Sequence, residues 1–301
     1  MKSTSALNAA EAVDPDFLAL SALEQRVFLL RKERWFGYPL AKHILAELDD
    51  LLAYPRYDRP QNVLLYGVPD NGKSFIAKRF LKLHPPILLP NGEASRMPVI
   101  YMVAPDSASE PKFYGHLIKA TYAPTKLAPV SNMRAQAVRL MKTVKARVLI
   151  VDEIQQVLTG GGNRQEAMLN ALKTVASEAQ VSIVAVGVRK SLSVLMLDPQ
   201  IASRFDRIEL PLWKQGEQFN ILLNTFEKSI EEQLPKRSGL GRPAMSKKIY
   251  AMTDGALGYV VQLLTAAAVC AVRTGKDRIT MDIFESMRWM SPRERTGRAL
   301  E

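Results

Sequence analysis

The sequence predicts an α/β fold, in which a buried parallel sheet with flanking helices precedes a small all-helical domain. The first observation behind this prediction is a set of short, continuous apolar runs at residues 63–66, 99–103, 148–151, 181–186 and 208–210. Helical stretches separate the runs, as expected for strands whose two faces are both covered by helices. The second observation is that after Pro211 apolar residues recur only at helical spacing. The chain has 301 residues, 47% of them hydrophobic, which is enough apolar material for a packed core.

The N-terminal segment, residues 1–58, is expected to be a polar tail followed by two helices. Helical spacing of apolar residues predicts these helices at 17–30 and 39–53, and the aromatic turn Arg34–Pro39 separates them. Pro55 and Pro60 then mark a linker, because proline breaks both helix and strand.

Residues 59–211 are expected to form the α/β core, with helices at 75–83 and 164–179 between the strands. Residues 212–290 are expected to form the helical domain, and residues 291–301 a basic tail. Within the helical domain, the pattern predicts helices at about 219–230, 245–253, 259–274 and 281–290. Thr280 is the expected N-cap of the last of these.

Composition excludes several classes of protein. A single cysteine, Cys270, excludes an intramolecular disulfide and a cysteine-built zinc site, and three scattered histidines form no ligand cluster. No stretch approaches the ~20 apolar residues of a membrane span, and no secretion signal is recognisable, so we expect a cytoplasmic protein without membrane contact. The formal net charge of +11 favours an acidic partner such as nucleic acid, although a basic surface can also serve solubility alone.

The segment Gly67–Ser74 matches the phosphate-binding pattern G-x-x-x-x-G-K-[ST], between a predicted strand and a predicted helix. Glycine lets the backbone curl so that successive N–H groups point at phosphate oxygens, and the following helix adds the partial positive charge of its N-terminus. Lys73 is the expected ligand of the β- and γ-phosphates, and the Ser74 hydroxyl that of Mg²⁺. We therefore predict ATP as the ligand. The predicted contact residues are Gly67, Pro69, Asn71, Gly72, Lys73, Ser74 and Phe75.

Two carboxylates, Asp152 and Glu153, follow the apolar run 148–151. Ligands of α/β sheets bind at the carboxyl ends of the strands, which is where these side chains are expected. Asp152 is predicted to hold Mg²⁺ and to contact the nucleotide, and Glu153 to act as general base toward the attacking water. Taken alone, the pair could equally cap the next helix. Together with Lys73 and Ser74 it predicts an ATPase.

Beyond these motifs, the chain resembles the AAA+ ATPases, and within them the TniB/TnsC branch that regulates DNA transposition, with MuB and IstB as more distant relatives. The resemblance covers roughly residues 30–285. Four elements carry the resemblance: Arg34–Pro39, Asn71–Ser74, Val151–Glu153, and Val186–Lys190 with the following Gln200–Phe205. It implies a P-loop core followed by a helical lid.

The resemblance also implies partners. Such proteins assemble as ATP-dependent rings or helical filaments on double-stranded DNA, and they recruit a DDE transposase, often with a TniQ-type targeting protein. Arg204 matches the arginine of the family's "RF" element, which implies a role in trans at a neighbouring copy's γ-phosphate. Without the resemblance, a surface salt bridge would be the simpler interpretation of Arg204, and the nearby Arg207 competes for the role.

Two departures from the family pattern point to slow hydrolysis. Val188 stands where the family usually has a polar sensor residue, so sensing is either weak or transferred to Arg189 or Ser191. In addition, the segment Gly255–Gly258 contains no arginine where many AAA+ proteins carry one in the lid.

From Lys112 to Arg147 the chain has eight Lys or Arg residues and no Asp or Glu. In ring-shaped relatives this region faces the DNA-filled pore, so the predicted DNA-binding residues are Lys112, Lys126, Ser131 and Arg134. Contacts to phosphates would give an affinity that depends on salt but little on base sequence. The alternative for the whole segment is a solvated helix face, which is the preferred interpretation of Arg139, Lys142 and Lys145.

Three further questions stay open at this point. The aromatic turn 35–38 either packs near adenine or belongs to the core. The tail arginines bind DNA or a transposase, or are simply solvated. As a function, the alternatives to a transposition regulator are a helicase-loader or clamp-loader-like AAA+ ATPase and a non-hydrolysing scaffold that ATP stabilises.

Overall fold

The computed structural model describes residues 15–56, 58–90, 94–125, 128–158, 162–196 and 199–297, and the chain forms two compact units. One unit comprises Gly37–Leu212. The other joins the N-terminal residues up to Phe36 with the residues from Trp213 onward. The contacts thus divide the predicted N-terminal extension between the two units. The division of the chain into segments 1–58, 59–211, 212–290 and 291–301 stays a prediction.

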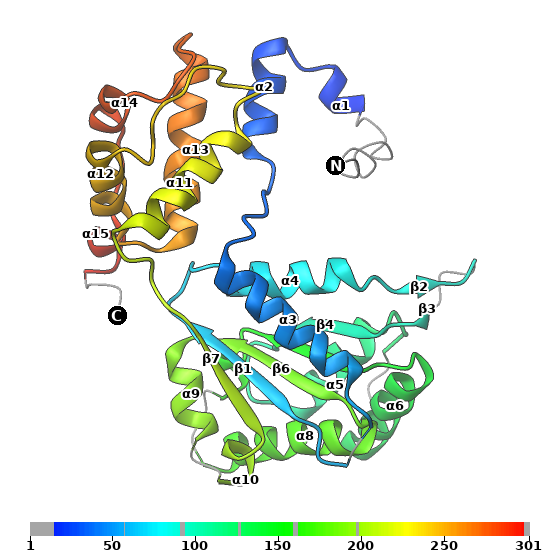
Figure 1. The fold of residues 1–301 in the computed structure, drawn as a ribbon. Helices are drawn as coiled ribbons and strands as arrows, with labels where there is room; N and C mark the ends of the chain where they lie inside the picture. The colour runs from blue at the N-terminus through cyan, green and yellow to red at the C-terminus, as the bar shows by residue number, and fades with distance from the viewer. Residues whose placement is uncertain are drawn as a thin grey trace. The chain divides into compact units, whose positions relative to one another are not determined.

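The α/β unit is built on a five-stranded sheet in the order β4-β5-β6-β1-β7 (Figure 1). Its strands, in the order of the chain, are β1 (Asn62–Gly67), β4 (Val99–Val103), β5 (Val148–Asp152), β6 (Ser182–Gly187) and β7 (Phe205–Leu210). Every pair of neighbours is parallel, so all five carboxyl ends lie at one edge. The predicted parallel sheet is confirmed.

Strand β7 begins three residues earlier than the apolar run predicted. It lies at the edge of the sheet and carries the exposed charged residues Asp206, Arg207 and Glu209. An edge strand has one face and one side open to water, so its sequence is not continuously apolar. Only the C-terminal half of β7 is therefore recognisable as an apolar run.

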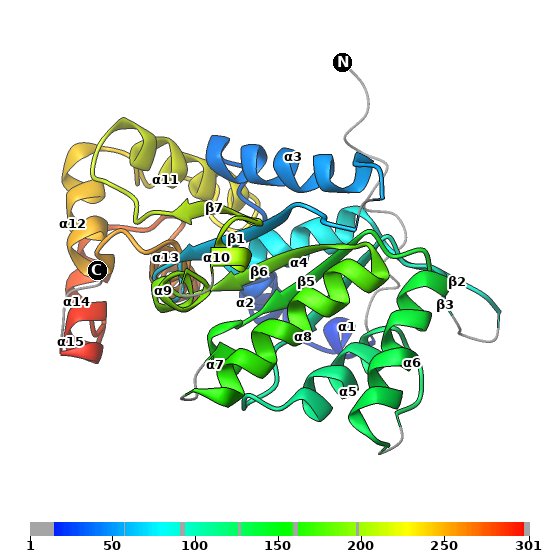
Figure 2. The same ribbon diagram turned by 90° about the horizontal axis from the view of Figure 1, so that it is seen from below.

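Helices cover both faces of the sheet (Figures 1 and 2). Helices α3 (Pro39–Ala53) and α4 (Lys73–Leu83) lie on one face. Helices α5 (Glu110–Ala120), α6 (Val130–Thr143) and α8 (Asn163–Ala179) form a layer on the other. Three short helices complete the unit: α7 (Gln155–Leu158), α9 (Arg189–Leu195) and α10 (Pro199–Ala202).

The core of this unit lies between the sheet and the α5–α6–α8 layer. Leu64, Leu149 and Ile183 from three strands pack there with Phe113 of α5 and Leu172 of α8, and all are buried. Complete burial of one such side chain contributes about 1.5–3 kcal/mol, so the layer is firmly fixed to the sheet. The ends of the strands, where the predicted site lies, therefore rest on a well-packed scaffold.

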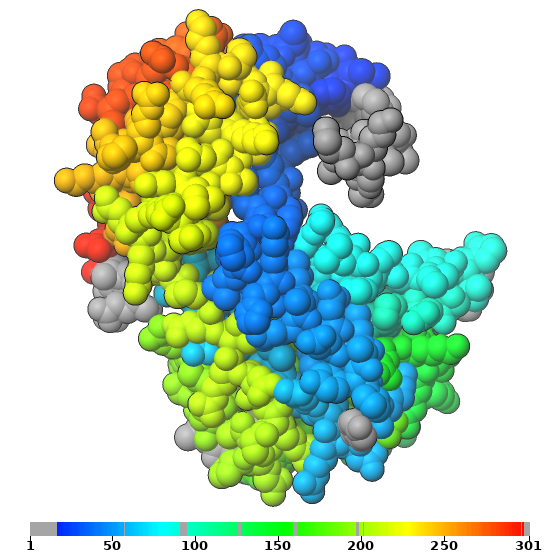
Figure 3. Space-filling model, in the orientation of Figure 1, coloured from blue at the N-terminus to red at the C-terminus, as the bar shows by residue number. Residues whose placement is uncertain are grey.

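A two-stranded antiparallel hairpin, β2 (Ile87–Leu88) and β3 (Ala94–Arg96), interrupts the crossover from α4 to β4. In the space-filling view it projects from the α/β unit, in cyan (Figure 3). The sequence did not predict it, because its strands of two and three residues are too short to show a period.

The second unit is helical. Its elements are α1 (Pro15–Leu18), α2 (Ala22–Arg31), α11 (Glu217–Ser229), α12 (Pro243–Thr253), α13 (Leu257–Arg273), α14 (Met281–Ser286) and α15 (Pro292–Thr296). Helix α2 packs against α13, the most apolar of them. Within the described ranges no single helix is long and apolar enough to cross a membrane, and α12 with α13 passes that test only as a pair bent by 117°.

The predicted helix 17–30 is in fact two helices. Ser21 starts α2 with a capping box: the Glu24 N–H donates to Ser21 Oγ at 3.3 Å, and the Ser21 N–H donates to the Glu24 carboxylate at 3.2 Å. This reciprocal cap supplies partners for N–H groups that a new helix start leaves unpaired. The chain therefore turns at residue 21 although the apolar spacing continues through it.

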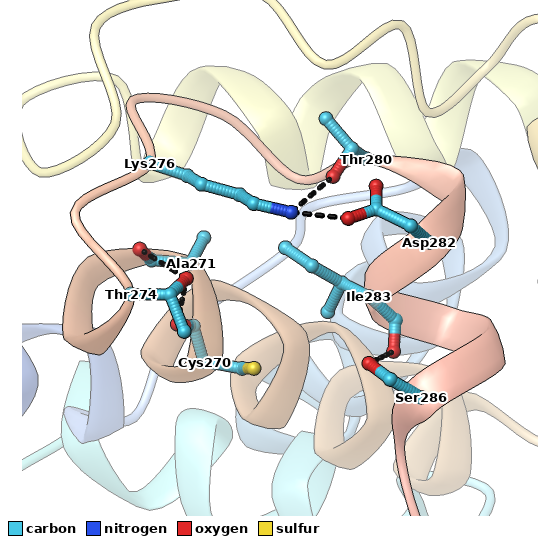
Figure 4. Close-up of polar contacts among 8 residues, drawn as sticks. All are labelled: Cys270, Ala271, Thr274, Lys276, Thr280, Asp282, Ile283 and Ser286. Carbon is cyan, nitrogen blue, oxygen red and sulfur yellow. Dashed lines mark hydrogen bonds and ion pairs between the residues drawn. The ribbon is translucent and has the colours of Figure 1, made fainter.

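The last predicted helix is shorter than expected, ending at Ser286. Thr280 does precede it, but the Thr280 hydroxyl makes no capping bond and instead accepts one from Lys276 Nζ at 3.4 Å (Figure 4). Lys276 also pairs with Asp282 in the first turn of α14. The start of α14 is thus fixed by the Lys276 ammonium.

The C-terminal tail is not free as far as the structure describes it. Arg293 Nε lies 2.9 Å from a carboxylate oxygen of Asp254. The Arg295 guanidinium lies over two rings, 5.3 Å from the centre of Tyr259 and 5.1 Å from that of Trp289. These contacts hold α15 against its own unit, so solvation alone does not describe these two arginines.

Candidate functional site

The loop between β1 and α4 is curled as a phosphate-binding loop requires. Asp70 has φ +54° and Gly72 has φ +93°, and α4 begins directly afterwards at Lys73. A Cβ atom at Gly67 would stand 2.4 Å from the Leu210 carbonyl oxygen, so only glycine fits between β1 and β7. The first turn of α4 offers unpaired N–H groups and the helix dipole to an anion. Pro69 is exposed on the loop, and Phe75 is half-buried in the first turn of α4.

Lys73 is buried, with 8% of its surface exposed. Its Nζ donates to the Val68 carbonyl oxygen at 2.6 Å, within the same loop. Burial lowers the pKa of Lys73, while the nearby Glu153, Asp152 and Asp70 oppose that effect. The ammonium thus lies over the loop, beside the carboxylates that end β5.

Asp152 connects three elements at the carboxyl end of the sheet. Its Oδ1 lies 3.1 Å from the Ser74 hydroxyl of α4, and its Oδ2 accepts a hydrogen bond from the Tyr101 hydroxyl of β4 at 2.7 Å. Burial, together with the bond to Asp152, raises the pKa of Tyr101, so this phenol stays a donor. Tyr101 is a site residue that the sequence did not identify, since its ordinary role within an apolar run is packing.

Glu153 directly follows β5 in the left-handed backbone region, with φ +55°. Its N–H donates to Asp152 Oδ1 at 2.9 Å, and its carboxylate accepts a hydrogen bond from the side chain of Gln155. A non-glycine residue at this φ is uncommon and typical of functional sites. The structure therefore brings Lys73, Ser74, Asp152 and Glu153 together, as the sequence predicts.

Asn71 has a different role from the one expected of it. Only 1% of its surface is exposed, and its side-chain amide donates to the Leu210 and Pro211 carbonyls at 3.0 and 2.7 Å. These bonds attach the phosphate loop to the end of β7. Any contact of Asn71 with a phosphate is therefore left to its backbone N–H.

Of the two residues proposed to replace the missing sensor, one is buried and the other forms an exposed ion pair. Ser191 is completely buried, and its hydroxyl has no hydrogen-bond partner within the described ranges. Arg189 forms an ion pair with Glu209 of β7. The N–H of Val188 donates to Gln155 Oε1 at 3.3 Å, so a side chain from the β5 end contacts the sensor position.

Arg204 lies away from this site. It immediately precedes β7, and its carbonyl accepts a hydrogen bond from the N–H of Asn62, the first residue of β1. The phosphate loop follows the opposite end of β1, six residues on. At ~3.3 Å per residue that separation is roughly 20 Å, too far for Arg204 to reach a phosphate of its own subunit.

Three of the four predicted DNA-binding residues lie on α5 and α6, and Lys126 falls outside the described residues. Lys112 Nζ lies 2.8 Å from Asp106 Oδ1, and an Arg134 nitrogen lies 3.9 Å from a Glu178 oxygen. Ser131 is exposed in the first turn of α6. Acidic residues from outside the segment thus compensate part of its charge. The exposed positions remain accessible to a phosphate backbone.

The aromatic turn divides between the units. Phe36 stacks on Phe226 with ring centres 5.8 Å apart, which is core packing of the helical unit. Arg34 donates to the Leu29 and Leu30 carbonyls at the end of α2. Burial raises the pKa of Tyr38 to about 12. For Phe36, the packing alternative is therefore the one observed.

The chain is similar to a known bacterial family and to archaeal replication proteins. A family model described as "Bacterial TniB protein" matches residues 26–215. The ORC1-type DNA replication protein 2 of Thermoplasma acidophilum is 24% identical over 263 residues, covering 83% of this chain. The match covers 61% of that relative, so the chain spans about three fifths of its length.

Solved structures with the same fold include two ORC proteins of Aeropyrum pernix. ORC1 in complex with DNA gives a TM-score of 0.60 at 17% identity, covering 86% of this chain and 68% of that one. ORC2 in ADPNP–ADP complexes gives 0.57 at 16% identity, covering 87% and 70%. Cdc6p of Pyrobaculum aerophilum gives 0.58 at 15% identity, covering 84% and 67%. These likenesses show a shared fold, in which a parallel sheet between helices is followed by a helical domain.

Proposed function

Because the chain belongs to the bacterial TniB family, we propose that it is an ATP-dependent DNA-binding regulator of transposition. In this proposal, ATP binding assembles copies of the chain as a ring or filament on double-stranded DNA in the cytoplasm. The assembly then recruits a DDE transposase, with or without a TniQ-type protein, to the insertion site. The observation that carries the proposal is the convergence of Lys73, Ser74, Asp152 and Glu153 at the carboxyl edge of the sheet.

The residues at that edge suit a magnesium nucleotide. The Ser74 hydroxyl and the Asp152 carboxylate, 3.1 Å apart, are the hard oxygen ligands that Mg²⁺ prefers when phosphates supply the rest. Bound there, Mg²⁺ would neutralise charge on the β- and γ-phosphates. The loop N–H groups and Lys73 would hold the same phosphates, with Lys73 exchanging its bond to the Val68 carbonyl for a phosphate oxygen.

Hydrolysis would proceed by in-line attack of water on the γ-phosphorus. Glu153 would accept a proton from the water as the new P–O bond forms and the bond to the ADP oxygen breaks. The products are ADP and inorganic phosphate. Turnover is expected to be slow, because the segment Gly255–Gly258 contains no arginine where many AAA+ proteins carry one in the lid.

Arg204 would act on a neighbouring copy. Its place at the far end of the sheet from its own loop excludes a role in cis, and a planar guanidinium suits the charge that develops on a transferring phosphoryl group. We expect Arg204→Ala and Lys73→Ala to be inactive alone and partly active when mixed, because a mixed interface can combine an intact loop with an intact arginine. Arg207→Ala tests the competing candidate in the same way, and it should stay active without mixing. If the mixture is as inactive as its components, Arg204 does not act in trans.

The test of assembly compares nucleotides on duplex DNA. With a non-hydrolysable ATP analogue we expect DNA-bound rings or filaments in electron micrographs, and far fewer with ADP or without nucleotide. Absence of DNA binding with the analogue would refute the proposal. Purification of a helicase with the protein instead of a transposase would favour the loader alternative. Assemblies of Glu153→Gln that dissociate as fast as those of the wild type would favour the non-hydrolysing scaffold.

A further inference from the structure

The side chain of Gln155 connects Glu153 with the end of β6. Gln155 is the first residue of α7, and its Nε2 donates to a carboxylate oxygen of Glu153. Its Oε1 accepts the N–H of Val188 at 3.3 Å. The orientation of the amide is determined by its partners: a backbone N–H can only donate, and a carboxylate can only accept. The NH2 group therefore has to face Glu153.

The backbone of β6 is shaped to admit this side chain. A Cβ atom at Gly187 would lie 2.8 Å from Gln155 Oε1 and 2.4 Å from Ser191 Oγ. Any larger residue at 187 would thus push the amide away from Val188. The end of β5 is also tied to β6 independently, since the Ile154 N–H donates to the Val186 carbonyl at 2.9 Å. The backbone next to Gln155 is thus held against β6, and the far end of the Gln155 side chain is bonded to the backbone of Val188.

We propose that Gln155 is the positioning residue that replaces the polar side chain missing at Val188, by holding the Glu153 carboxylate toward the attacking water. This inference rests on the proposed ATPase. A glutamate side chain has several rotamers, and holding it in one of them keeps its oxygen within hydrogen-bond reach of the water. Of the two other residues considered for this role, Arg189 is paired with Glu209 and Ser191 is buried.

The distinguishing property of a positioning residue is its effect on kcat without an effect on nucleotide binding. Gln155→Ala removes the bond to Glu153, and we expect kcat to fall about 10- to 100-fold, the loss typical of a misplaced reacting group. Affinity for a non-hydrolysable ATP analogue should stay at the wild-type value, because Gln155 contacts neither Lys73 nor Ser74. Tm should fall by no more than a few degrees, because the Val188 N–H that loses its acceptor belongs to a partly exposed residue. Gln262→Ala, which truncates the same side chain at an exposed position of α13, is the control and should retain full turnover.

A second variant separates the two ends of the amide. Gln155→Glu keeps an oxygen for the Val188 N–H but has no N–H to donate, so it should lower kcat at least as far as Gln155→Ala. Wild-type turnover in either variant overturns the inference while leaving the ATPase proposal intact. A fall in kcat that is matched by lost analogue affinity or by a large drop in Tm also overturns it, because Gln155 would then be structural. A wild-type protein that binds the analogue but hydrolyses no ATP overturns both the hydrolysis and the inference.

Discussion

The bonds of Asn71 to the end of β7 predict that Asn71→Ala destabilises the α/β unit. The substitution removes the donor to two carbonyl groups. The Leu210 carbonyl belongs to a buried residue, and leaving such an acceptor unpaired costs about 1–3 kcal/mol. The Pro211 carbonyl belongs to an exposed residue that water can reach, so its loss is about 0.5–1.5 kcal/mol. The sum is about 1.5–4.5 kcal/mol.

For a unit of this size, each kcal/mol lowers Tm by about 2–4 °C, so Tm should fall by about 3–18 °C. Urea unfolding followed by circular dichroism gives the free energy directly. Asn170→Ala, on the exposed side of α8, is the matched control and should change the free energy of unfolding by less than about 0.5 kcal/mol. Asn71→Asp should be worse than Asn71→Ala, because it directs a carboxylate at two carbonyl oxygens. An Asn71→Ala protein as stable as the control would refute this account of the loop.

Two further predictions concern pH and salt. Burial, with a smaller effect from Glu110, raises the pKa of Tyr114 to about 12, whereas the unfolded chain ionises near 10.0. The protonated phenol of Tyr114 therefore contributes fully to the free energy of unfolding below pH 10.0, and this contribution is lost as the pH rises above 10.0. Urea unfolding on both sides of pH 10.0 should show a smaller decrease in the free energy of unfolding for Tyr114→Phe than for the wild type. An identical decrease in the two proteins would contradict the assignment. Replacement of Lys112 and Lys126 by alanine should reduce the slope of log K for DNA binding against log salt by about 2, and the control Arg139→Ala should leave the slope unchanged. An unaltered slope in the double variant would place the DNA path elsewhere.

The sequence was most informative where short-range pattern and long-range structure coincide. A run such as 148–151 is apolar because helices cover both faces of the sheet, so it predicts a strand directly. The meeting of Lys73 with Asp152 was predictable as well, because the carboxyl ends of parallel strands share one edge. The division of the predicted helix 17–30 could have been recognised from the capping-box pattern, Ser21 followed three residues later by Glu24. The apolar spacing, which continues through residue 21, obscured this pattern.

The other contacts of the site could not be predicted, because each joins a side chain to a partner that has no recognisable pattern in the sequence. Asn71 binds backbone carbonyls about 140 positions away, and every residue type offers such a carbonyl. Gln155 likewise accepts a hydrogen bond from the backbone N–H of Val188, just after β6, and any residue except proline offers such an N–H. The charge of Lys112 is compensated by Asp106, which lies just outside the acid-free segment and is brought to it by the start of α5. Such contacts require the fold to be known first.

The claim on which the whole account rests is that the loop at Lys73 binds a nucleoside triphosphate. Calorimetric titration with a non-hydrolysable ATP analogue and Mg²⁺ tests it most directly. Wild type and Lys78→Ala, an exposed lysine on the same helix, should bind with equal affinity, and Lys73→Ala should lose about a hundredfold, or about 2.7 kcal/mol. Equal binding by Lys73→Ala, or no binding by the wild type, would contradict the account.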